Sequence, residues 1–100
     1  MPINLRGLFG KFSSDTSTVT LFNIGTSAVT VAASNPVRLR VKIWNETGTL
    51  YVKEGAGASA TNYTYRLVAN TQAIIDESYT GIVTAIKQTG TTAVLVTTIP

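Results

Sequence analysis

The 100-residue chain contains no cysteine and no histidine, and only 13% of its residues are charged. Without cysteine it can form neither a disulfide nor a thiolate nucleophile, and without histidine it lacks the commonest general base and metal ligand. Its only adjacent carboxylates, Asp76 and Glu77, would point to opposite sides of a strand and could not share a proton. We therefore expect a protein that is not an enzyme and that binds neither a metal nor an organic cofactor.

Long hydrophobic runs are also missing. No stretch approaches the roughly 20 apolar residues of a membrane span, and the N-terminal residues lack the continuous apolar run of a signal peptide. The net charge of +3 is a mild basic bias, whereas nucleic-acid binders usually concentrate more charge on one face. We expect a protein that is made in a cytoplasm and has no membrane partner.

Hydrophobic residues make up 44% of the chain, and the charged share is about half the usual value. A free monomer commonly carries more charge than this for solubility. We expect part of the surface to be covered in the working state, although the seventeen threonines offer an alternative source of polarity. Threonine is β-branched and suits strand faces that need some polarity.

Segments in which apolar and polar residues alternate recur along the chain, with turn residues between them. They span residues 17–22, 28–33, 37–44, 49–54, 63–69, 73–77, 82–88 and 92–99. A spacing of roughly 8–12 residues is typical of a sandwich or barrel. The predicted fold is all-β: an antiparallel β-sandwich or jelly-roll-like barrel of about eight short strands. We interpret residues 45–48 as a hairpin loop and the small-residue stretch 55–62 as a flexible loop.

The first sixteen residues follow a different pattern, with large apolar residues at near-helical spacing that Gly7 and Gly10 interrupt. An isolated helix this short is marginal in water. We expect an extended N-terminal arm over residues 1–16, followed by a β-sandwich domain over residues 17–100; a frayed tag is the alternative. The predicted arm anchors, which would dock on a neighbouring subunit, are Leu5, Leu8, Phe9 and Phe12.

Apolar and cationic residues alternate in the segment VRLRVKIW at residues 37–44, so a strand formed by it would have one apolar face and one cationic face. Its cationic side carries Arg38, Arg40 and Lys42, with Trp44 in line, and we predict these four as partner-binding residues. The row could dock on an acidic protein surface with Trp44 as its anchor, or it could be a solvated face that blocks unwanted strand pairing. A third interpretation is contact with a nucleic-acid backbone, but a single-strand binder needs aromatic residues between the cations, and only Trp44 stands in line with this row.

Between residues 29 and 96, five segments follow one another in a characteristic order: VTVAAS, VRLRVKIWNETGTLYVKEGAGAS, YRLVANTQAIID, YTGIVTAI and TAVLVT. This layout resembles small β-sandwich virion proteins of tailed phages, which include capsid decoration (cement) proteins and head-fibre or neck components. The resemblance implies a non-enzymatic structural role on a virion. It also implies a symmetric homo-oligomer, for which we favour a trimer, with arms that reach across neighbouring subunits.

The leading hypothesis is a capsid decoration (cement) protein that stabilises the major capsid lattice of a tailed bacteriophage. Its partners would be the major capsid protein or other virion proteins, and it would reside in the virion after synthesis in the host cytoplasm. One alternative is a neck, tail or head-fibre component of the virion. A remote alternative from another class is a single-stranded nucleic-acid-binding module, whose affinity would fall steeply with salt.

Overall fold

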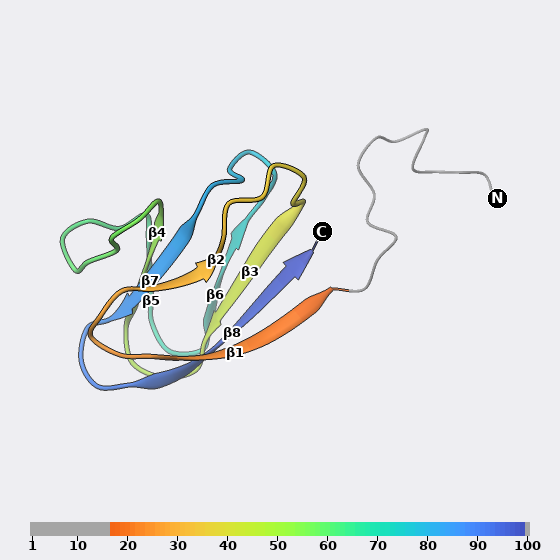
Figure 1. The fold of residues 1–100 in the computed structure, drawn as a ribbon. Helices are drawn as coiled ribbons and strands as arrows, with labels where there is room; N and C mark the ends of the chain where they lie inside the picture. The colour runs from red at the N-terminus through yellow and green to blue at the C-terminus, as the bar shows by residue number, and fades with distance from the viewer. Residues whose placement is uncertain (1–16, 100) are drawn as a thin grey trace, which may run out of the picture.

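The structure, a computed structural model, describes residues 17–99, apart from the side chain of Thr92. These residues form eight strands: β1 (Thr18–Ile24), β2 (Val29–Ala32), β3 (Arg40–Asn45), β4 (Leu50–Glu54), β5 (Tyr65–Leu67), β6 (Thr71–Ile75), β7 (Val83–Lys87) and β8 (Thr92–Ile99). Each strand overlaps one of the segments of alternating residues, and the predicted all-β fold is confirmed (Figure 1). No helix in this part of the chain is long and apolar enough to cross a membrane. The predicted arm, residues 1–16, lies outside the described residues.

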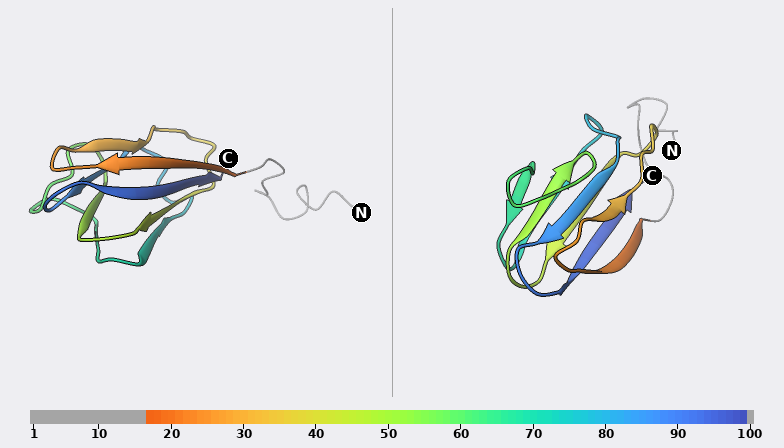
Figure 2. Two further views of the ribbon diagram at one scale, coloured as in Figure 1. Left: turned by 90° about the horizontal axis from the view of Figure 1, so that it is seen from below. Right: turned by 60° about the vertical axis from the view of Figure 1, so that its left-hand side comes forward.

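The strands form two four-stranded sheets that pack face to face (Figure 2). Sheet A has the order β1-β8-β3-β6 and sheet B the order β2-β7-β4-β5. The pairs β1 with β8, β2 with β7, β3 with β6, and β4 with β5 are all antiparallel. The chain is therefore folded like one long hairpin whose turn lies between β4 and β5. Its successive strand pairs lie alternately in sheet A and sheet B. This is the strand order of a jelly roll.

The connection between β3 and β4 corrects one prediction. Residues 45–48 do not close a hairpin, because β3 pairs with β6 and β8 while β4 pairs with β5 and β7. Instead the connection crosses from sheet A to sheet B. Ile43 and Val52 both face the shared interior, from opposite layers. Alternation reports which side of a strand is buried but not which sheet the strand joins, so the sequence pattern fits either arrangement.

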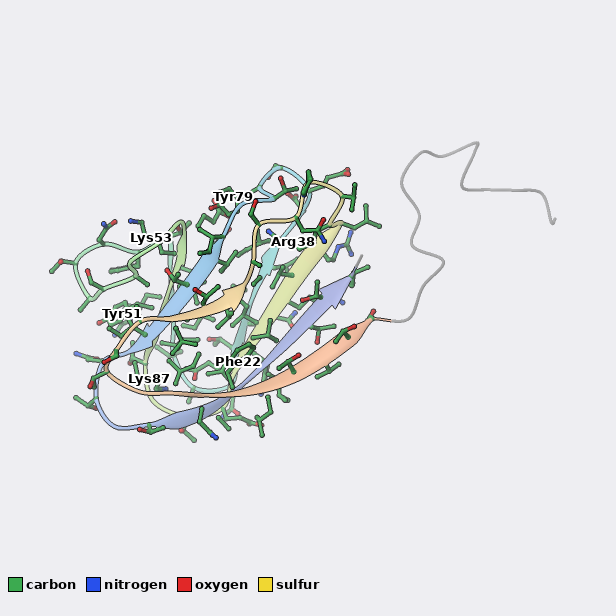
Figure 3. All side chains as sticks on the ribbon, in the orientation of Figure 1. Phe22, Arg38, Tyr51, Lys53, Tyr79 and Lys87 are labelled. Atoms are coloured by element: carbon green, nitrogen blue, oxygen red, sulfur yellow. The ribbon has the colours of Figure 1, made fainter. Side chains whose placement is uncertain are left out.

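The core lies between the sheets and is built from β-branched and other aliphatic side chains. Ile43, Leu50, Val52, Val83 and Val94 have no exposed surface. Burying one such side chain contributes about 1.5–3 kcal/mol relative to leaving it in water. Phe22, near the end of β1, packs against this cluster from the edge of sheet A (Figure 3). Because successive side chains of a strand point to opposite sides, each sheet has one inner face in this core and one outer face.

Candidate functional site

The outer face of sheet A carries apolar side chains together with two cations. The register aligns its residues in cross-strand rows, so that neighbouring side chains stand about 5 Å apart on one side of the sheet. The rows are Leu21, Leu95, Trp44 and Gln72; Val19, Thr97, Lys42 and Ile74; and Ile99 with Arg40. We call these ten residues the sheet A outer face. None of them is acidic.

Three large apolar side chains on this face are open to solvent. Val19 and Leu21 are each 60% exposed and Ile74 is 50% exposed, whereas Trp44 and Leu95 are half-buried among their neighbours. Soluble monomers usually keep contiguous exposed apolar surface small, and larger patches mark interaction sites. The sheet A outer face is therefore the strongest candidate binding surface among residues 17–99.

The outer face of sheet B is different because the chain covers part of it with its own loop. In residues 55–64, the Ala58 amide donates to Thr84 Oγ1 over 3.0 Å, and that hydroxyl donates to Gly55 O over 2.7 Å. The ring of Tyr63 lies 4.7 Å from the ring of Tyr51, centroid to centroid. Ala58 is only 3% exposed and Tyr51 only 6%. The two outer faces are thus unequal: the loop covers part of one, while the other presents apolar side chains to solvent.

The same contacts correct the interpretation of this stretch as a flexible loop. Small residues are present there because the chain must lie close against sheet B, which is why Ala58 fits beneath the loop surface. Gly57 has φ of +73°, a backbone conformation that a side chain disfavours. Glycine and alanine therefore serve close packing and tight turning here, two roles that composition alone does not separate from mobility.

Arg38 does not belong to the cationic row, and its prediction as a residue on that face is wrong. Val37 is 69% exposed, and its amide donates to Asn35 Oδ1 in a turn that includes Pro36. Because this turn delays the start of β3 to Arg40, the alternation does not extend back to residue 38. Arg38 is 1% exposed and points inward. The surface row is reduced to Arg40 and Lys42, which weakens the nucleic-acid interpretation.

The guanidinium of Arg38 joins two connections at one end of the sandwich. Its Nη1 donates to Ala33 O over 2.9 Å, and its Nη2 donates to Tyr79 O and Gly81 O, each over 3.1 Å. Burial lowers the pKa of Arg38 below its ordinary value. The Nε atom is buried without a hydrogen-bond partner among the described residues. These contacts give Arg38 a structural role, holding the β2–β3 connection against the β6–β7 connection.

A second buried cation, Lys87, lies toward the opposite end of the sandwich (Figure 3). It is 3% exposed, and its Nζ donates to Asn45 Oδ1 over 3.2 Å and to Thr47 O. Burial lowers the pKa of Lys87. The sequence carries a signal for this burial, since Lys87 has the same parity in β7 as the core residues Val83 and Ala85. Neither buried cation is available to a partner at the surface.

Two carboxylates among residues 17–99, those of Glu54 and Asp76, accept hydrogen bonds from nearby residues. Tyr65 Oη donates to Glu54 Oε2 over 3.2 Å, and burial together with this carboxylate raises the pKa of Tyr65. Asp76 Oδ1 accepts the Ser78 amide over 2.9 Å, and hydrogen bonds from Ser78 lower the pKa of Asp76. Within residues 17–99, no group of three or more carboxylates gathers as a metal site.

Of the eight predicted partner-binding residues, three share the sheet A outer face: Arg40, Lys42 and Trp44. The sequence reasoning missed their apolar neighbours on this face, of which Val19, Leu21 and Ile74 are the most exposed. The register between β1, β8, β3 and β6 brings these two groups together. The four predicted arm anchors, Leu5, Leu8, Phe9 and Phe12, lie outside the described residues. No protein-family model, no curated protein and no solved structure matches this chain.

Proposed function

We propose that this protein is a non-enzymatic structural component of a virion, and specifically a capsid decoration (cement) protein of a tailed bacteriophage. The resemblance of residues 29–96 to such proteins supports the proposal. The jelly-roll strand order is compatible with it, since viral capsid domains are one class that uses this architecture. Because one fold serves many functions, a function has to be inferred from the exposed surface and not from the fold alone.

The observation that carries the proposal is the inequality of the two outer faces. Sheet B is partly covered by its own loop, whereas sheet A presents Val19, Leu21 and Ile74 to solvent. Trp44 lies between these residues, and Arg40 and Lys42 add positive charge. An aromatic anchor among apolar residues, with charge alongside, is the composition of a protein interface. A body that adheres by one face suits attachment to a large surface such as a capsid.

The cationic character of this face indicates an acidic area on the major capsid protein as its target. Repetition on a lattice multiplies weak contacts through a high effective concentration. A protein that binds only the assembled shell stabilises that shell by RT ln(1 + [L]/Kd) per site. Modest affinity per copy therefore suffices for a cement.

The decisive experiment is to measure how many copies of the polypeptide purified virions contain, by quantitative mass spectrometry. Many copies in a fixed ratio to the major capsid protein support decoration. A few copies per particle would favour the alternative of a neck, tail or head-fibre component. Complete absence from virions would overturn the proposal.

A binding assay on capsids stripped of this protein tests the surface itself. Lys42→Glu is expected to weaken capsid binding because it reverses a charge on the sheet A outer face. Arg66→Glu is the matched control, since Arg66 is an exposed cation of sheet B. In the same assay, deletion of residues 1–12 is expected to abolish binding if the predicted arm anchors act. Full occupancy by the truncated chain would refute the arm.

A further inference from the structure

The edge strand β1 differs from the other three sheet edges. An edge strand presents unpaired N–H and C=O groups, and proteins usually blunt it by shortness, by a bulge or by charge. In sheet B, β5 has three residues, and β2 has four with a register shift. In sheet A, β6 is followed at once by Asp76 and Glu77. By contrast, β1 has seven residues, pairs with β8 without a register shift and contains no charged residue.

The first half of β1 is exposed on both sides. Thr18, Val19, Thr20 and Leu21 are all exposed, although Thr18 and Thr20 have the parity of the inner face. In sheet B the corresponding edge strand, β2, has only four residues. Figures 1 and 2 show that β1 begins beyond the end of β2, so β2 does not cover the inner side of this half of β1. This half of β1 therefore presents both its backbone edge and its apolar side chains.

We propose that β1 is the contact through which two copies of this chain associate, as an antiparallel β1–β1 pair around a two-fold axis. The pairing joins two four-stranded copies of sheet A into one continuous sheet. With the axis at Thr20, Val19 lies opposite Leu21 of the second copy, and Thr20 lies opposite its own equivalent. At its centre this register matches apolar with apolar residues and threonine with threonine, as cross-strand pairing favours, while Thr18 lies opposite Phe22 on either side.

Because β1 contains no charged residue and is self-complementary about Thr20, a second copy can occupy this edge without opposing charges. Each chain has a net charge of +3, so two copies associate most readily where no cations oppose each other. Arg40 and Lys42 lie on β3, two strands and about 10 Å from the edge of β1. The other edge of sheet A, β6, is shorter, with five residues, and the charged pair Asp76 and Glu77 follows it at once. Because a two-fold contact uses the same edge of both chains, it closes at a dimer, unlike the trimer that the resemblance implies.

Val19 and Ile74 provide a matched pair of test sites for this contact. They stand in the same cross-strand row, at opposite edges of sheet A, with exposures of 60% and 50%. Sedimentation equilibrium of the full chain is expected to give twice the 10.6 kDa monomer mass at high concentration. Val19→Lys is expected to raise the dimer dissociation constant about tenfold or more, whereas Ile74→Lys is expected to leave it unchanged.

Disulfide trapping provides a second test, and the absence of native cysteine makes it specific. In the proposed register the two copies of a Thr20→Cys variant lie within disulfide range, so mild oxidation should yield a covalent dimer. Gln72→Cys, on β6, is the control and should remain monomeric on a non-reducing gel. A wild-type chain that stays monomeric at every concentration would overturn the proposal. Equal loss of association in Val19→Lys and Ile74→Lys, or equal trapping at both cysteines, would overturn it as well.

Discussion

Lys87 and Asn45 are hydrogen-bonded across the interior, with Nζ donating to Oδ1 over 3.2 Å, although they are 42 residues apart. The contact links β7 of sheet B to the end of β3 in sheet A. The Asn45 amide nitrogen donates to Gly48 O over 2.9 Å and to Leu67 O over 3.0 Å. Asn45 therefore binds the sheet-to-sheet connection, the end of β5 and the buried ammonium at once.

Asn45→Ala is expected to lower the free energy of unfolding by about 3 kcal/mol. The substitution leaves two carbonyls without their donor and a buried ammonium without one acceptor, and each such loss costs about 1–3 kcal/mol. Urea denaturation followed by circular dichroism measures the change. Glu46→Ala, at the exposed neighbouring position, is the control and is expected to stay within about 0.5 kcal/mol of wild type. A similar small effect for Asn45→Ala would refute the role assigned to this side chain.

The lowered pKa of Lys87 predicts a pH dependence of stability. Above the folded-state pKa and below the ordinary value of 10.5, the unfolded chain holds more protons at this site than the folded chain. The free energy of unfolding therefore rises with pH in this window. The pKa of Tyr65 is raised in the folded state, so above its ordinary pKa of 10.0 this residue lowers the free energy of unfolding as the pH rises. To isolate the effect of Lys87, urea denaturation should therefore be measured from neutral pH to just below pH 10.0, the ordinary pKa of tyrosine.

Lys87→Met removes the titrating group and is expected to remove this rise. Lys53→Met is the control, since it deletes a lysine from sheet B while Lys87 remains, and the rise should persist. Identical pH profiles for wild type and Lys87→Met would contradict the assignment. The comparison of slopes matters more than absolute stability, because Lys87→Met also leaves Asn45 Oδ1 and Thr47 O without this donor.

The strands were predictable from sequence because each strand has one face toward the core, which produces an alternation of apolar and polar residues. The pairing of the strands was not, since Ile43 and Val52 face the same core whether they share a sheet or not. The sheet A outer face was half predictable: Arg40, Lys42 and Trp44 are evident in one strand. Val19 and Ile74 join them only through the registers with β8 and β6, which are long-range contacts.

Arg38 was misassigned because alternation holds only inside a strand, and β3 begins two residues later. Its buried role predicts that Arg38→Lys lowers the free energy of unfolding by about 2 kcal/mol or more. A lysine has one ammonium where the guanidinium reaches three carbonyls from a planar fork. Arg40→Lys is the exposed control, and urea denaturation should separate the two variants. Equal stability of both would refute the structural role.

Thr84 controls whether the loop at residues 55–64 stays on sheet B. Its hydroxyl accepts the Ala58 amide and donates to Gly55 O, and the residue is 4% exposed. Thr84→Val keeps the shape but removes both hydrogen bonds, leaving two backbone groups unpaired when the loop is docked. The loop is therefore expected to undock more often. The Ala58 amide should exchange with deuterium about tenfold faster or more, and chymotrypsin should cleave after Tyr63 more readily.

Thr84→Ser separates the hydroxyl from the methyl group in the same experiment. Serine retains the donor and acceptor, so slow Ala58 exchange should persist, although the lost methyl group lowers global stability slightly. Global unfolding must be measured alongside, because exchange limited by whole-chain opening would accelerate every core amide equally. Selective acceleration at residues 55–64 in Thr84→Val alone is the expected result. Acceleration in Thr84→Ser but not in Thr84→Val would assign the docking to packing at the methyl group, and the hydrogen-bond explanation would be wrong.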